Sequence, residues 1–317
     1  MSCAGWYRWF GEHDARGRSP SYARLAVAVA DDVELCGWID RLPPAKQQPN
    51  LLFAATRVLG GPTESWPAFR TFVDEHWTQV ADLMASRSTQ TNEPARCASL
   101  LPVLAALPQP LALIELGASA GLCLFPDRYH YRYDDVTVGS SPVSVDVECC
   151  GPVPVPTELP TVVWRAGVDL EPRDVTVPED LDWLRACIWP EQIGRHRRFD
   201  AAVAIASAEP PTLVQGDLVD RLPELLDAAP AGATKVVQHS VVLFYLEHER
   251  RQALATMLDG RDDVVWVSME GPGHVPRIAT DARPPQSQNQ QSYMVIGVGG
   301  RGAVGLAGPH GSWLSWF

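Results

Sequence analysis

The sequence has no apolar run long enough to cross a membrane, and its first residues lack the apolar core of a signal peptide. It also lacks any C-x-x-C pair. Its seven cysteines are odd in number and scattered, so neither a disulfide framework nor a zinc site is predicted. We therefore expect a cytoplasmic protein with reduced thiols, no metal site and no membrane partner.

A positive net charge is also missing. The formal net charge of −12 at pH 7 argues against a protein that coats phosphate backbones, so we expect no nucleic-acid partner. With 317 residues and 46% hydrophobic composition, the chain can form one large α/β domain or a smaller one with an accessory domain. Composition leaves the oligomeric state open.

No period-two run of β-branched residues occurs before residue 110. Apolar residues instead recur at three-and-four spacing, which predicts helices within 21–40, 50–60, 67–87 and 94–107. We expect an all-helical domain over residues 1–90 and a second domain over 91–317. The last of these helices should be capped by Thr91 or Asn92, and its start, with Glu93 and Arg96, should lie near the end of the strand that follows.

The stretch from Leu111 to Leu122 (Leu-Ala-Leu-Ile-Glu-Leu-Gly-Ala-Ser-Ala-Gly-Leu) predicts a buried strand, a tight turn and a helix start. Such a turn can hold a nucleotide-like cofactor over helix N-terminal amides, with Glu115 at the strand end and Gly117 and Gly121 in the turn. It can equally be a G-x-S-x-G nucleophile elbow, with Ser119 as the attacking hydroxyl. Close packing of a helix on a strand, without any site, is a third interpretation. These residues alone leave the three open.

A segment at about 126–160 interrupts the alternation of strands and helices. Tyrosines alternate over 129–133 and valines over 143–147, on either side of a Gly-Ser-Ser-Pro sequence, which predicts an inserted antiparallel β-hairpin. Beside a turn site, such an insertion can be a lid, a substrate wall or an edge decoration.

Two later strands run into acidic residues. Asp169 ends the strand at 161–169, where an acidic side chain of a doubly wound sheet can accept hydrogen bonds from both ribose hydroxyls of a cofactor. Asp217 follows the short strand at 212–215 and is placed to accept a hydrogen bond from an adenine amine. The alternative for Asp169 is a residue that caps a loop.

The rest of the chain keeps the alternation, with strands at 235–239 and 263–270, a helix at 246–258 and a closing hairpin at 294–298 and 303–307. This order predicts a doubly wound, largely parallel sheet with both faces covered. The ends of its fourth and fifth strands carry His239 and Glu270. We expect His239 to be a general base, with Glu270 and His310 behind it, and a buried structural histidine is an equal interpretation.

The nucleophile-elbow interpretation requires several strands before the nucleophile, yet everything before residue 111 is predicted to be helical. Ser119, an acid such as Asp262, and His310 do follow the chain order of an α/β-hydrolase. Because most chains contain that order, an esterase using Ser119 is kept only as an alternative.

The order of these features resembles the class I S-adenosylmethionine-dependent methyltransferases, in which an E/D-x-G-x-G-x-G motif precedes an acidic ribose ligand and an adenine-side Asp. The resemblance covers residues 90–317. It implies a mostly parallel seven-stranded sheet with an antiparallel last strand, and a small-molecule methyl acceptor of unknown identity. It implies S-adenosyl-L-methionine as cofactor, bound by Glu93, Arg96, Glu115, Gly117, Ser119, Gly121, Asp169 and Asp217.

Ser119 departs from this pattern because it stands where the middle glycine would be. A dinucleotide dehydrogenase fits less well, since the second glycine of its G-x-G-x-x-G turn is also absent. A non-catalytic cofactor-binding or regulatory module of the same fold is a second alternative.

The whole chain also resembles a bacterial family known as domain of unknown function 2332. The resemblance rests on the stretches at 115–122, 167–172 (Gly-Val-Asp-Leu-Glu-Pro) and 310–316 (His-Gly-Ser-Trp-Leu-Ser-Trp). It implies no substrate.

Overall fold

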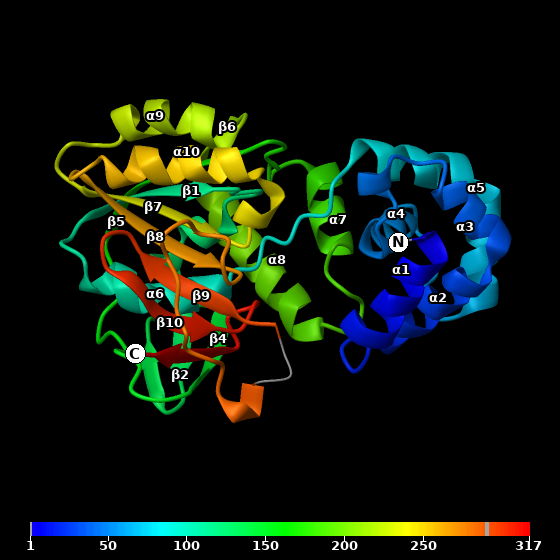
Figure 1. Ribbon diagram of the computed structural model, residues 1–317, viewed down its shortest axis with the longest axis horizontal. Helices are drawn as coiled ribbons and strands as arrows, with labels where there is room; N and C mark the ends of the chain where they lie inside the picture. Colours follow the sequence, from blue (N-terminus) through cyan, green and yellow to red (C-terminus); the bar gives the residue numbers. More distant parts are fainter. Residues whose placement is uncertain (1, 289–291) are drawn as a thin grey trace. The chain divides into compact units, whose positions relative to one another are not determined.

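The computed structural model describes residues 2–288 and 292–317, and the chain forms two compact units (Figure 1). The first unit comprises Met1–Thr91 and Thr176–Arg197, and the second comprises Asn92–Val175 and Arg198–Phe317. The segment 176–197, which the sequence analysis assigned to the second domain, therefore belongs with the N-terminal helices. It does so because Trp183 is buried in their apolar core.

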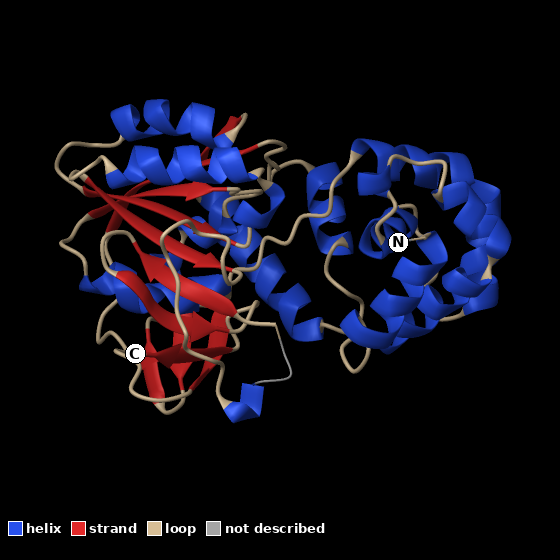
Figure 2. Cartoon of the chain, in the orientation of Figure 1, coloured by secondary structure: helices blue, strands red, loops and turns tan. Residues whose placement is uncertain are grey.

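The first unit is helical, as predicted (Figure 2). The predicted helix at 21–40 is two helices, because the Asp32 carboxylate accepts a hydrogen bond from Leu35 N at 2.8 Å and starts a second one. The α-helices of this unit are α1 (Cys3–Trp9), α2 (Pro20–Asp31), α3 (Val33–Ile39), α4 (Pro49–Val58), α5 (Trp66–Ser86) and α7 (Pro178–Ala186). Helix α8 (Ile193–Ala208) leads on into the second unit.

The second unit is built on one sheet, whose described strands have the order β3-β2-β4-β11-β10-β9-β8-β7-β1-β5-β6. The strands are β1 (Leu111–Leu116), β2 (His130–Tyr133), β3 (Val136–Val138), β4 (Ser144–Cys149), β5 (Val162–Asp169), β6 (Thr212–Gln215), β7 (Thr234–Ser240), β8 (Val264–Glu270), β9 (Met294–Val298), β10 (Gly302–Ala307) and β11 (Trp313–Trp316). Most neighbouring pairs are parallel, as expected.

The expectation of seven strands with an antiparallel last strand is corrected. Over the described residues the sheet has 11 strands, and β9 is the strand that lies antiparallel beside the parallel strand β8. The additional strands join the sheet because β11 pairs in parallel with β4 of the insertion. Strand β11 is not predicted from the sequence.

The inserted segment is also paired differently from the prediction. Strands β2 and β4, which were expected to form an antiparallel hairpin, run parallel to each other. The antiparallel partner of β2 is β3. Asp134 has a left-handed φ of 47° and reverses the chain directly after β2, so the hairpin closes earlier than the Gly-Ser-Ser-Pro sequence suggests.

Five parallel strands form the doubly wound part of the sheet, in the order β6-β5-β1-β7-β8. From β1 the chain moves outward to β5 and β6 and then returns to the other side of β1 with β7. The switch point therefore lies between β1 and β7, and ligands of such sheets bind outside the carboxyl ends of the strands at this point.

Helices cover both faces of this sheet (Figure 1). Helices α9 (Leu218–Ala228) and α10 (His248–Asp259) pack on the face that carries Ile114 and Leu116. Helix α6 (Arg96–Ala106) lies on the other face, to which Glu115 points because side chains alternate along a strand. Within residues 2–288 and 292–317, no helix is long and apolar enough to cross a membrane.

The predicted helix start after β1 is wrong. The turn leads instead into two short 3-10 helices, Leu122–Leu124 and Pro126–Arg128. Pro126 lacks the backbone N–H that a continuing helix would need and disfavours helical geometry in the residue before it. The turn consequently has no α-helix N-terminus behind it.

Candidate functional site

The turn between β1 and the first 3-10 helix lies at the switch point and is strained. Gly117, Ser119 and Gly121 have left-handed φ values of 72°, 51° and 71°. Glycine adopts this conformation freely, whereas serine does so at a cost of about 1 kcal/mol or more. Surrounding contacts must therefore hold Ser119 in place.

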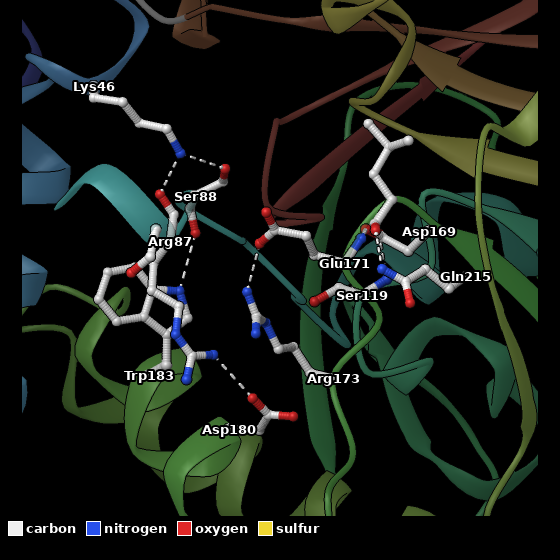
Figure 3. Close-up of polar contacts among 12 residues, drawn as sticks. Lys46, Arg87, Ser88, Ser119, Asp169, Glu171, Arg173, Asp180, Trp183 and Gln215 are labelled. Carbon is white, nitrogen blue, oxygen red and sulfur yellow. Dashed lines mark hydrogen bonds and ion pairs between the residues drawn. The ribbon is translucent and has the colours of Figure 1, made fainter. Parts of the chain in front are cut away.

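Asp169 supplies one of these contacts (Figure 3). Its Oδ2 accepts a hydrogen bond from Ser119 N at 2.8 Å, and its Oδ1 accepts one from Glu171 N at 2.9 Å. The turn is held further by Arg173 N, which donates to Ser119 O at 3.0 Å. A carboxylate offers about four acceptor positions, so one position on each oxygen of Asp169 is left for a ligand.

Asn92 spans the other side of the turn. Its Nδ2 donates to Ala118 O at 3.0 Å, and its Oδ1 accepts from Leu122 N at 2.9 Å. The prediction that this segment lies near the turn is therefore confirmed, but the predicted capping role is wrong. Helix α6 begins only at Arg96 and has no side-chain cap.

Glu93 is buried directly after Asn92. Its Oε1 accepts from Arg198 Nε at 2.8 Å and from Ala95 N at 3.2 Å. Glu93 thus helps to fix the start of α6, and the structure brings it next to the turn through Asn92.

A buried polar cluster lies under the turn on the α6 side of the sheet. Glu115 on β1 is opposite Gln238 on β7 in the parallel register. In the described part of the chain, Glu115 Oε2 and Gln238 Oε1 are buried without a hydrogen-bond partner. Burial raises the pKa of Glu115 well above its usual value, Cys123 raises it further, and the Arg96 guanidinium acts in the opposite direction.

Arg96 connects two loops at the carboxyl edge of the sheet. Its Nη1 donates to Ser240 O at 3.2 Å and its Nε donates to Pro309 O at 3.1 Å. Because His310 follows Pro309, this contact brings the predicted residue His310 to the same edge.

The loop after β7 is also strained. Val241 has a left-handed φ of 55°, which is a genuine outlier for a β-branched residue. The next residue, Val242, packs against Gly117, where any side chain on Gly117 would collide with the Val242 methyl groups. The loops that follow β1 and β7 therefore touch at the switch point.

Glu270 at the end of β8 holds this loop. Its Oε1 accepts from Val242 N at 2.9 Å and from Leu243 N at 3.2 Å. Nδ1 of His239 lies 2.8 Å from the same oxygen, and Nε1 of Trp266 lies 2.9 Å from Nε2 of His239. Since an indole N–H can only donate, Nε2 accepts, and the proton of a neutral His239 is on Nδ1.

Both ring nitrogens of His239 are thus engaged by protein groups. The geometry gives His239 and Glu270 a positioning role beneath the loop after β7. The assignment of His239, Glu270 and His310 as acid or base residues remains a prediction.

The two loops are held in the same way. A carboxylate at the end of β5, Asp169, fixes the strained loop after β1, and a carboxylate at the end of β8, Glu270, fixes the strained loop after β7. In the sheet order β5-β1-β7-β8, the two carboxylates flank the switch point from opposite sides. Strain of this kind concentrates at functional sites.

Asp217 lies farther out, after β6. It caps α9, with its Oδ1 accepting from Val219 N at 2.8 Å and Asp220 N at 3.3 Å, and it pairs with Arg250. Burial acts to raise the pKa of Asp217, but the hydrogen bonds from Arg250, Val219 N and Asp220 N together outweigh it and lower the pKa. These donors all contact Oδ1, so Oδ2 is the oxygen that could accept a hydrogen bond from an adenine amine.

Three residues at this site, Gln238, Val241 and Val242, are not predicted from the sequence. Gln238 left a signal, because a polar residue interrupts an apolar buried strand opposite Glu115. The two valines left none, because valine is among the residues least suited to a left-handed turn. Among the described residues, no group of three or more His, Cys, Asp or Glu side chains is arranged to hold a metal ion.

Comparison with known protein families identifies a match over nearly the whole chain. The family described as "Uncharacterized protein conserved in bacteria (DUF2332)" matches residues 4–316. The chain belongs to this family. No curated protein and no solved structure matches it.

Proposed function

We propose that this DUF2332 protein binds S-adenosyl-L-methionine and transfers its methyl group to a small-molecule acceptor. The observation that carries the proposal is the position of Asp169. It ends the strand next to β1, holds the Ser119 turn at the switch point and retains one acceptor position on each carboxylate oxygen. Two such positions suit the two hydroxyls of a ribose.

The buried polar atoms around the turn also suit this cofactor. Glu115 Oε2 and Ser119 Oγ are buried without a hydrogen-bond partner in the described chain, and a buried polar group without a partner is unfavourable. An amino group and a carboxylate, both present in the methionine part of the cofactor, would satisfy them. The cofactor supplies an electrophilic methyl group, and the protein residues supply binding and orientation.

One feature distinguishes this chain from the methyltransferases it resembles. A 3-10 helix follows the turn, so the amides and dipole of an α-helix N-terminus do not contribute to binding. Binding would depend more strongly on Asp169 and on the polar cluster at Glu115.

The esterase alternative rests on the strained conformation of Ser119. A nucleophilic serine needs a base within hydrogen-bond reach, and in the described residues Ser119 Oγ has no hydrogen-bond partner. Labelling by a fluorophosphonate probe tests this alternative. Labelling that Ser119→Ala abolishes would favour the esterase and contradict our proposal.

Isothermal titration calorimetry with S-adenosyl-L-methionine tests the proposal directly. Wild-type protein should bind, and Asp169→Ala should abolish measurable binding because it removes the proposed ribose acceptor and releases the turn. The matched variant Ser119→Ala should retain much of the affinity, since it keeps the backbone N–H that Asp169 accepts. Absence of binding by the wild type at millimolar cofactor would contradict the proposal.

A non-catalytic module would bind the cofactor without turnover. Formation of S-adenosylhomocysteine in the presence of an acceptor separates this alternative from a methyltransferase.

A further inference from the structure

The loop after β7 exposes aromatic side chains at the edge where ligands of doubly wound sheets bind. After the strained Val241 and the Val242 that contacts Gly117, the chain forms a short 3-10 helix, Leu243–Tyr245. Leu243 is buried and anchors it. Phe244 and Tyr245 are 43% and 63% exposed, and their ring centroids lie 3.8 Å apart.

A third ring comes from the loop after β8. The ring centroid of His274 lies 6.3 Å from that of Phe244. In the described part of the chain, His274 Nδ1 is shielded from solvent and has no hydrogen-bond partner. The surface formed by Phe244, Tyr245 and His274, here called the aromatic surface, thus combines apolar ring faces with an imidazole.

The part of the aromatic surface formed by Phe244 and Tyr245 is anchored by a buried network. The Glu270 carboxylate fixes Val242 N and Leu243 N, and Glu270 is itself bonded to His239, whose other nitrogen is bonded to Trp266. Exposing two adjacent large rings on a loop fixed by a buried network gives no gain in folding stability, because burying them would be favourable. Rigid rings of this kind bind flat ligands at low cost in conformational entropy.

We propose that the aromatic surface binds a planar aromatic molecule that carries a hydroxyl or amino group. Ring faces of Phe244 and Tyr245 favour stacking with a planar ligand over contact with a saturated one of similar size. The second ring nitrogen of His274, Nε2, is not among the shielded polar atoms and provides the polar partner for a hydroxyl or amine. The assignment of this aromatic molecule as the methyl acceptor rests on the proposed function. Its binding to the aromatic surface does not require the cofactor.

Ligand-observed saturation-transfer NMR, recorded without cofactor, tests the binding. The probes are 2-naphthol and its saturated counterpart decahydro-2-naphthol. Wild-type protein should transfer saturation to 2-naphthol and much less to the saturated alcohol. Loss of one ring should weaken the affinity from about 2-fold to about 10-fold, so the double variant Phe244→Ala/Tyr245→Ala should lose most of the signal.

Phe317→Ala is the matched control. Phe317 is 55% exposed and follows β11, which runs in the opposite direction to β10 and so ends at the other edge of the sheet. This control should retain the wild-type signal. Equal transfer to both probes, an undiminished signal in the double variant, or an equal loss in Phe317→Ala would each overturn the inference. These outcomes are independent of calorimetry with S-adenosyl-L-methionine, so the failure of either proposal is recognisable on its own.

Discussion

At the scale of single residues, the site depends on backbone conformations that its side chains disfavour. Ser119 and Val241 both have left-handed φ values. A carboxylate holds each of them, because Asp169 accepts from Ser119 N and Glu270 accepts from Val242 N, directly after Val241. The contacts of Asp169 and Glu270 offset the free-energy cost of these left-handed conformations. The change in the free energy of unfolding when such a side chain is removed should therefore include relief of backbone strain as well as loss of side-chain contacts.

Val241→Gly is expected to cost less stability than Val264→Gly. Both valines are partly buried, but Val264 lies in the regular strand β8, where valine is favoured. Glycine relieves the left-handed strain at position 241, so the free energies of unfolding of the two variants should differ by about 1–2 kcal/mol. Urea titration measures this difference, and equal losses would show that Val241 is not strained.

At the scale of secondary-structure elements, the sheet positions the site through strand ends. Asp169 and Glu270 are the last residues of β5 and β8, and each fixes the loop of the strand beside it. A loop after one strand is thus held by a carboxylate at the end of the neighbouring strand. The spacing of the strands therefore sets the spacing of the two loops. Rigid elements place ligand-binding groups more precisely than free loops do.

Glu270→Gln is expected to loosen the loop after β7. His239, Val242 N and Leu243 N contact Oε1, and Val242 N also donates to Oε2 at 3.2 Å. The amide nitrogen of glutamine can only donate, so at least one of these contacts is lost whichever oxygen it replaces. We expect a stability loss of about 2–4 kcal/mol and amide hydrogen exchange at Val242 and Leu243 that is at least about tenfold faster.

Asp263→Asn is the control for that experiment. Asp263 immediately precedes the other end of β8, where it pairs with Lys235 and Arg261 at the surface. Its replacement removes a charge without changing the shape of the side chain, and exposed pairs contribute little. Exchange at Val242 and Leu243 should stay at the wild-type rate. If Glu270→Gln also left that rate unchanged, the contacts of Glu270 would not be what holds the loop after β7.

At the scale of the whole molecule, the chain forms two units whose sequences interleave. Residues 176–197 leave the β5-to-β6 connection and complete the helical unit. Trp183 on α7 is buried there, and its Nε1 donates to Ser88 O at 2.9 Å (Figure 3). The helical unit therefore cannot complete its core from residues 1–91 alone.

Trp183→Ala is expected to destabilise the helical unit by about 3–5 kcal/mol, because it creates a large cavity and leaves Ser88 O without its donor. Trp9→Ala, which removes a tryptophan that is 44% exposed in the same unit, should cost less than about 1 kcal/mol. Urea denaturation followed by circular dichroism compares the two. Similar losses would mean that α7 adds little to the core.

Much of this architecture is predictable from the sequence, because local patterns determine it. The strands around Ile114, Val168 and Val237 follow from apolar runs, and Gly117 and Gly121 mark the turn between β1 and the next segment. The position of Asp169 beside that turn follows from the doubly wound order. Whether Asp169 binds a cofactor stays a prediction.

The failures come from contacts between distant segments. Nothing local shows that Asn92 bonds to Ala118 and Leu122 instead of capping α6, or that β11 pairs with β4. The missing helix after the turn depends on Pro126, whose effect reaches back over a segment too short to form a helix on its own. Pairing partners of this kind are fixed by the completed sheet.

The order of strands also bears on the behaviour of the protein at high concentration. The two outermost described strands are β3 (Val136–Val138) and β6 (Thr212–Gln215), which have three and four residues. Open sheet edges are templates on which other chains can add, and short edge strands limit this growth. The sheet thus offers few unpaired backbone N–H and C=O groups at its edges to a second copy of the chain. Placing short strands at the edges therefore limits fibrous self-association.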